Sequence, residues 1–156
     1  MNNKFKLIIA GGRDIKITPS RIKSLINALI CVEIRDLEIV HGGCPTGVDL
    51  AANYLKDLHW IGSGLKTTIF KADWKKFGKS AGPIRNREMA KYADHLLLVW
   101  DGKSKGSASM LKMAEKEELG ITQIILNDYS SWNDLKWSHD EFVYWVSRLK
   151  KDDENG

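Results

Sequence analysis

The chain has 156 residues, of which 43% are hydrophobic and 28% charged, a composition typical of one globular domain with its own core. Its net charge of +4 and pI near 9.0 suit an anionic ligand but are too mild to indicate nucleic acid. The sequence has neither a signal-peptide core nor an apolar run that could cross a bilayer, so we expect a cytoplasmic protein with no membrane partner.

Cys31 and Cys44 are the only cysteines, and neither shows metal-ligand spacing. This predicts free thiols in a reducing compartment, no metal site and no cofactor. We expect residues 1–150 to form a single domain and residues 151–156 a disordered, charged tail.

The first half of the chain predicts two strands, each followed by a helix. Phe5–Ala10 reads as a buried strand that ends at Gly11, Gly12 and Arg13. Thr18 and Pro19 are expected to start a helix, with an apolar face made by Ile22, Leu25, Ile26, Leu29 and Ile30. Leu37–Val40 is a second strand, which runs into a glycine-rich turn at His41–Asp49. The helix after this turn has a predicted apolar face of Leu50, Ala51, Tyr54, Leu55 and Leu58.

The second half of the chain repeats the alternation of strands and helices. A strand at Thr67–Lys71 precedes a polar loop at Lys75–Ser80, and a helix follows from Gly82 and Pro83. The strand Leu96–Trp100 is the most apolar and is expected at the centre of the sheet. Three further elements are predicted: a helix with Met110, Leu111, Met113 and Ala114 on its apolar face and Gly120 after its end, a strand at Ile121–Leu126, and an amphipathic helix from Ser138 or His139 to Leu149. Trp132, Trp137 and Trp145 are expected to pack that last helix or to form a subunit interface.

Strands that alternate with helices predict an α/β fold, a Rossmann-like doubly wound parallel sheet of about five strands with helices on both faces. Four loops with unusual chemistry follow strands. We therefore expect them to meet at the carboxyl edge of the sheet, where open α/β sheets bind ligands.

The run Ala81–Met89 carries the main binding prediction. Pro83 suits the first position of a helix, which would place Arg85, Asn86 and Arg87 in the first turn. Cations there oppose the helix dipole, and a bound anion would compensate them. The alternative is a pair of surface arginines that form ion pairs with Glu88 or with a distant carboxylate.

Two glycine-rich turns are candidate phosphate or ribose contacts, since glycines allow close backbone approach and the following helices offer free N–H groups. The alternative is that the glycines serve only to allow the backbone angles of a tight turn. The candidate residues in these turns are Gly42, Gly43, Thr46, Gly47, Gly102, Ser104, Gly106 and Ser107.

Acids and aromatics near the same edge are further candidates. Asp49 could contact the ligand or simply favour the helix N-terminus. Asp73 and Trp74 follow a strand, and Trp74 could stack on a base or pack its own loop. Asp101 could accept a hydrogen bond from a ribose hydroxyl. Trp100 is expected in the core and Cys44 is a weak nucleophile candidate. The four histidines, His41, His59, His95 and His139, are expected to be structural.

Five segments together resemble the SLOG superfamily, named for the Smf/DprA and LOG proteins, and most closely its YspA/YpsA-related branch, long regarded as a domain of unknown function. The segments are Gly11–Arg13, His41–Asp49, Ala72–Trp74, Gly82–Met89 and Trp100–Ser107. The resemblance covers about Lys4 to Leu126. It implies a Rossmann-like fold and a nucleotide or nucleotide-derived ligand, for example a nucleoside monophosphate, ADP-ribose or an NAD-like molecule.

The superfamily includes LOG phosphoribohydrolases, which release the base from a nucleoside monophosphate. Their catalytic arginine matches Arg85 or Arg87 in place, but Met110 stands where their catalytic glutamate falls. Cleavage of a glycosidic bond needs a carboxylate, so Asp49, Asp73 or Asp101 would have to replace it. We therefore expect a nucleotide-binding protein, such as a sensor. The alternatives are a nucleotide N-glycosidase and, with least support from the charge, a DprA-like single-stranded DNA binder. Homo-oligomers are also expected.

Overall fold

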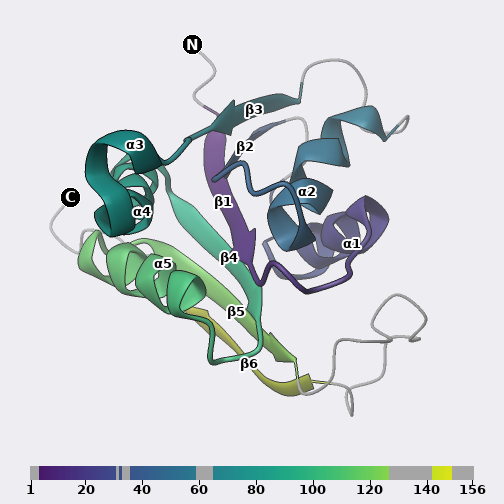
Figure 1. Cartoon of the computed structure of the whole chain (residues 1–156). Coiled ribbons are helices and arrows are strands. Elements are labelled where there is room, and N and C mark those ends of the chain that lie inside the picture. The colour runs from purple at the N-terminus through teal and green to yellow at the C-terminus, as the bar shows by residue number, and fades with distance from the viewer. Residues whose placement is uncertain (1–3, 31, 33–35, 59–64, 127–141, 149–156) are drawn as a thin grey trace, which may run out of the picture.

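The computed structural model describes residues 4–30, 32, 36–58, 65–126 and, for the backbone alone, 142–148. It confirms the predicted α/β Rossmann-like fold. The sheet has six strands in the order β3-β2-β1-β4-β5-β6, and the first five of these, β1 to β5, are mutually parallel (Figure 1).

The strands β2, β4 and β5 are mostly buried, as expected for a parallel sheet covered on both faces, whereas β3 has no buried residue. The bounds of the six strands are β1 (Phe5–Gly11), β2 (Leu37–His41), β3 (Lys66–Ile69), β4 (His95–Trp100), β5 (Gly120–Leu126) and β6 (Phe142–Arg148). All six residues of β4 are buried, and β4 lies between β1 and β5, which confirms its predicted central place.

The helices form one layer on each face of the sheet (Figure 1). They are α1 (Pro19–Leu29), α2 (Gly47–Asn53), α3 (Trp74–Phe77), α4 (Ala81–Tyr92) and α5 (Lys105–Lys116), with short 3₁₀ turns η2 (Tyr54–Asp57) and η3 (Gly78–Ser80). Neighbouring residues of β1 point to opposite layers. Leu7 and Ile9 pack with α1 and α2, whereas Ile8 packs with α4 and α5.

The predicted start of α1 is confirmed. Thr18 is the N-cap, its side chain accepts a hydrogen bond from the Arg21 amide, and Pro19 is the first helical residue.

The predicted end of α5 is wrong in one respect. The left-handed residue after this helix is Glu118, with φ 56°, and not Gly120, which already belongs to β5. Gly120 is required for another reason, because a Cβ there would lie 2.2 Å from Nδ1 of the buried His95.

The predicted apolar face of the second helix is also partly wrong. Ala51 and Leu55 are buried as predicted, but Leu50 and Tyr54 are 37% and 49% exposed, and Val48 and Ala52 complete the buried face. The reason is the spacing of the buried residues, because Val48, Ala51, Ala52 and Leu55 follow one another at i, i+3, i+4 and i+7 and form one face, from which Leu50 is turned away.

The polar loop predicted at Lys75–Ser80 is helical. The turns α3 and η3 lead directly into α4, which therefore begins at Ala81. Pro83 is its third residue, a position whose backbone N–H has no acceptor within the helix, so the N–H that proline lacks is not missed there. Arg85 and Arg87 consequently lie in the second turn, so the dipole argument for an anion at these two arginines no longer holds.

The predicted C-terminal helix is wrong where it can be compared. Residues 142–148 form β6, which pairs antiparallel with β5. The run FVYWVSR consists mainly of β-branched and aromatic residues, and its strand propensity prevails over the apparent helical spacing. The expectations for the helix start, for Trp132, Trp137 and the tail, and for the side chain of Trp145, fall outside the described residues.

One buried carboxylate links the edge of the sheet to α4. Glu38 on β2 is 1% exposed and forms an ion pair with Lys66 of β3. Its oxygens also accept hydrogen bonds from the Tyr92 hydroxyl and, at 3.3 Å, from the Thr68 hydroxyl. Burial alone would raise the pKa of Glu38, but the hydrogen bonds from these three partners and the charge of Lys66 hold it below its ordinary value of 4.5.

This depressed pKa predicts an acid-sensitive contribution to stability. The contribution is present at neutral pH and is lost as the pH falls through the folded-state pKa of Glu38. We expect Glu38→Gln to lower the melting temperature at pH 7, with a difference from wild type that shrinks below about pH 4.5. Glu88→Gln, at an exposed site on α4, is the control. Equal effects of both changes at every pH, measured by circular dichroism, would contradict this role.

Candidate functional site

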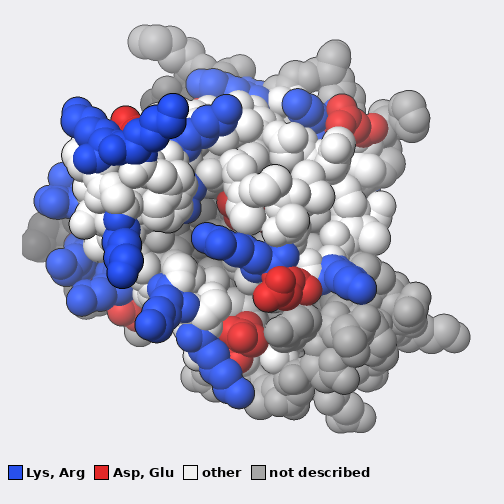
Figure 2. All heavy atoms as spheres, viewed as in Figure 1, with Lys and Arg blue, Asp and Glu red and all other residues white. Residues whose placement is uncertain are grey.

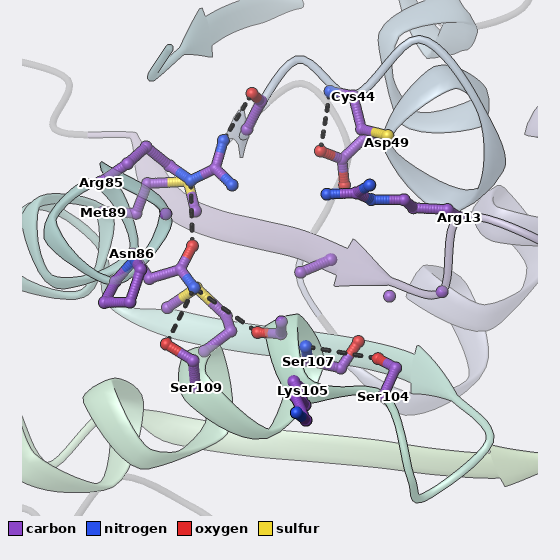
Figure 3. A pocket seen from close by; sticks show the side chains of 18 of the residues that line it. Arg13, Cys44, Asp49, Arg85, Asn86, Met89, Ser104, Lys105, Ser107 and Ser109 are labelled. Carbon is purple, nitrogen blue, oxygen red and sulfur yellow. Dashed lines mark hydrogen bonds between the residues drawn. The ribbon is translucent and has the colours of Figure 1, made fainter. Parts of the chain in front are cut away.

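A cavity of about 520 Å³ lies at the carboxyl ends of β1 and β4 (Figure 3). The strand order reverses its direction between these two strands, which is the topological switch point where open α/β sheets bind ligands. The walls come from the loops after β1, β2 and β4 and from residues of α2, α3, η3, α4 and the N-terminal half of α5. The volume is in the range of small-molecule sites.

Arg85 of α4 joins several of these walls. Its Nη1 donates to the carbonyl of Gly42 at 2.7 Å and to that of Phe70 at 3.3 Å, at the ends of β2 and β3. Its Nε donates to Oδ1 of Asn86 at 2.9 Å. Nη2 has no hydrogen bond among the described residues, and Arg85 lines the cavity. One side of the guanidinium is therefore structural.

Asn86 continues this connection to α5. Its amide nitrogen donates to the hydroxyl of Ser109 at 3.2 Å and, at the 3.5 Å limit, to the carbonyl of Gly106 (Figure 3). Asn86 is buried, so these partners satisfy a polar group that would otherwise be costly to bury. The position of α5 relative to α4 is thus fixed at the cavity.

Two glycines of the turn after β2 lie in close contact with other parts of the chain. A Cβ at Gly42 would lie 2.3 Å from Nη1 of Arg85. Gly47 has φ 68°, and a Cβ there would lie 2.2 Å from the carbonyl oxygen of Gly12. These glycines are explained by packing within the protein, and Gly47 does not line the cavity.

Asp49 is the most buried acid of the cavity wall, with 9% of its surface exposed. Its Oδ2 accepts a hydrogen bond from the Cys44 amide at 3.1 Å, which holds the turn after β2 against α2. Burial raises the pKa of Asp49, and the Cys44 hydrogen bond and the charges of His41 and Arg85 only partly oppose this.

The N-terminus of α5 forms the opposite wall. Ser104 is the N-cap and accepts from the Ser107 amide at 3.4 Å. The amides of Lys105 and Gly106 have no acceptor among the described residues, and both residues line the cavity. A Cβ at Gly106 would meet no atom within 4 Å, and Gly106 has no positive φ, so the folded chain itself gives no reason for a glycine here.

Asp101 shapes the loop before α5. Its Oδ1 accepts from the amides of Lys103 at 2.8 Å and Ser104 at 3.0 Å, and these hydrogen bonds lower its pKa. Asp101 lines the cavity, but one oxygen is committed to the loop.

Four cationic side chains surround the cavity, namely Arg13, Lys79, Arg85 and Lys105. Arg13 is near enough to Arg85 for its charge to lower the pKa of that guanidinium, in addition to the larger effect of burial. The acids of the wall are Asp14, Asp49 and Asp101. The cations outnumber the acids, and the two acids described above already accept hydrogen bonds from the backbone.

The remaining wall is apolar. Ile15, Met89 and Met110 line the cavity, and Met110 is 2% exposed. Trp74 of α3 stands at the mouth with 55% of its surface exposed, and its ring lies over Gly82 at the start of α4.

The structure brings most of the predicted site residues together at this cavity: Gly11, Gly12, Arg13, Gly42, Asp49, Trp74, Arg85, Asn86, Asp101, Ser104, Gly106 and Ser107. It places six others outside the cavity lining: Gly43, Thr46, Gly47, Asp73, Arg87 and Gly102. Asp73 caps α3 by accepting from the Lys76 amide at 3.0 Å, and Arg87 is exposed on the outer side of α4.

Sequence reasoning did not assign a binding role to Lys79, Lys105 or Ser109, all of which line the cavity. Lys105 adjoins the predicted Gly106 and could have been inferred from it. Ser109 lies one turn into α5, and its role depends on contact with Asn86. Lys79 reaches the cavity only because residues 74–80 are helical, which their composition did not indicate.

Two of the four histidines lie among the described residues, and both make structural contacts. His41 contacts Asn53 and accepts from the Gly43 amide, and His95 contacts Thr122. Burial lowers the pKa of His95 to about 4, so this side chain is neutral at pH 7. Within the described part of the chain no group of three or more metal-ligating side chains occurs, and no helix has the length and apolarity to cross a membrane.

No family model matches the chain. A comparison with curated proteins finds the Gene 61 protein of Mycobacterium phage D29, which is 31% identical over 86 residues. The match covers 54% of this chain and 69% of the phage protein. The chain belongs to the same family as this phage protein.

Proposed function

We propose that this chain is a SLOG-type protein that binds a nucleotide or nucleotide derivative in the cavity at the carboxyl edge of the sheet. The observation that carries the proposal is Gly106, a residue of the cavity lining where the folded chain does not need a glycine, because a Cβ would meet only open space. A ligand that approaches the backbone closely would explain this glycine.

A phosphate group fits the wall that contains Gly106. The unpaired amides of Lys105 and Gly106 lie at the positive end of α5, and the Lys105 side chain adds a full charge. The hydroxyls of Ser104 and Ser107 are further donors in the same wall.

The sugar and base fit the rest of the cavity. Asp49 and the unpaired Nη2 of Arg85 offer an acceptor and a donor to ribose hydroxyls. Met89, Met110 and the exposed ring of Trp74 offer apolar surface to a base. A pocket of about 520 Å³ has room for these three parts together.

Hydrolysis of the N-glycosidic bond is the second candidate function, because one observation favours it. Of the three predicted replacement acids, Asp49 alone is both buried and part of the cavity wall, and burial raises its pKa. A carboxyl with a raised pKa is suited to general acid–base catalysis. Met110, at the position of the LOG glutamate, cannot exchange a proton.

The binding proposal predicts that a side chain at position 106 blocks the ligand without harming the fold. Gly106→Leu adds a side chain at a residue of the cavity lining where a Cβ meets no other atom, and leucine is the better helix former, so the melting temperature should not fall. Calorimetry with adenosine 5′-monophosphate should show at least a tenfold loss of affinity. Ala108→Leu, on an exposed position of α5 outside the cavity, is the matched control. Equal affinity of both variants and the wild type would overturn the proposal.

The hydrolysis alternative makes a separate prediction. If Asp49 acts as the catalytic acid or base, purified protein should release free base from nucleoside monophosphates over many turnovers, and Asp49→Asn should abolish turnover while the ligand still binds. If the protein only binds, the wild type should release no base, as measured by chromatography. Met110→Glu then tests whether a carboxylate is all that is missing, with Met110→Gln as the uncharged control.

A further inference from the structure

The segment 71–80 forms a surface that does not contribute to the core. Residues 73–80 are all exposed, and none of the four residues of α3 is buried. Within this segment Trp74 and Phe77 are 55% and 40% exposed, although aromatic rings of this size are normally mostly buried.

Lysines surround the two rings. Lys71, Lys75, Lys76 and Lys79 are all exposed, and Asp73 is the only acid of the segment, which gives it a net charge of +3. The Lys76 ammonium lies 5.0 Å from the centre of the Phe77 ring. In Figure 2 blue side chains gather over the region where Figure 1 places α3 and α4. We call residues 71–79 the basic–aromatic surface.

The composition of this surface fits one class of partner. Exposed rings stack on unpaired bases, and neighbouring lysines neutralise the phosphates between them, which is how proteins hold single-stranded nucleic acid without sequence preference. An anionic membrane would use the lysines but needs a larger apolar face than two rings on one helical turn.

The surface is also continuous with the cavity. Trp74 and Lys79 belong to both, because they line the mouth of the cavity from α3 and η3. A strand on the basic–aromatic surface would therefore run toward a pocket with cationic walls. The mild net charge of the whole chain did not indicate a nucleic-acid surface. Such a surface depends on lysines that lie next to exposed rings, and net charge does not report that arrangement.

We propose that the basic–aromatic surface binds single-stranded nucleic acid, with bases stacked on Trp74 and Phe77 and phosphates paired with Lys75 and Lys76. Of the four residues that would contact the strand, Trp74 alone also lines the cavity. Lys75, Lys76 and Phe77 lie outside the cavity lining, so they can be changed without altering that site.

The test uses the full chain and a fluorescein-labelled 12-nucleotide oligodeoxythymidine, followed by fluorescence anisotropy at several salt concentrations. Wild type should bind with a salt dependence typical of phosphate contacts. The double variant Lys75→Glu/Lys76→Glu should weaken binding at least tenfold and reduce the salt slope by about 1.4, the value for two lost phosphate contacts on a single strand. Phe77→Ala should weaken binding about tenfold through lost stacking.

The matched control is Lys112→Glu/Lys116→Glu, which makes the same change of charge at exposed positions of α5 away from the surface. Equal weakening by the two double variants would mean that only net charge matters and would overturn the proposal. So would absence of oligonucleotide binding, or equal binding of anionic vesicles. The affinity for adenosine 5′-monophosphate, measured by calorimetry, should be unchanged in Lys75→Glu/Lys76→Glu and in Phe77→Ala. This measurement separates the test of the surface from the test of the cavity.

Discussion

The architecture of the cavity depends on the hydrogen bonds of one guanidinium. Arg85 holds the carbonyls of Gly42 and Phe70, which follow different strands, and its Nε holds Asn86, which in turn holds α5. Charge-assisted hydrogen bonds of this kind are about twice as strong as neutral ones. Through them, one side chain of α4 is hydrogen-bonded to the turns after both β2 and β3. A Cβ at Gly42 would displace the Arg85 guanidinium, because Nη1 of Arg85 occupies that space.

This arrangement changes the meaning of the arginines. The sequence suggested that a bound anion compensates two cations at a helix N-terminus. In the structure Arg85 lies one turn further along and is partly satisfied by carbonyls, whereas Arg87 is exposed. The amides and side chain that suit a phosphate belong instead to Lys105 and Gly106 on α5. Arg85 builds the cavity and contributes one unpaired Nη2 to it.

The alternation of apolar runs and glycine turns was enough to predict the α/β fold and the edge that carries the cavity. It worked because strand residues such as Leu7, Ile8 and Ile9 must all be apolar when both faces of a parallel sheet are covered. It failed where one pattern of apolar residues is compatible with both a helix and a strand. The run Phe142–Arg148 has apolar residues at helical spacing, yet pairing with β5 makes it a strand.

The site could be predicted only in part, because a linear sequence does not show which residues far apart in the chain are in contact. Glycines and helix starts after strands identify an edge, and twelve of the predicted residues meet there. Whether a glycine serves the protein or a ligand depends on neighbours far along the chain. Gly47 lies against the backbone of Gly12 and Arg13, whereas Gly106 faces open space, and no local signal distinguishes the two. The surface role of Trp74 and Phe77 also requires knowing that α3 has no buried residue.

The central claim is that a nucleotide occupies the cavity at the switch point between β1 and β4. Titration of ¹⁵N-labelled protein with adenosine 5′-monophosphate, followed through the backbone amide signals, tests it most directly. The account predicts saturable shifts of Gly12, Gly42, Lys105 and Gly106, which line the cavity, and none in residues 22–29 of α1, which do not line it. Shifts that avoid Lys105 and Gly106, or no shifts at millimolar ligand, would contradict it.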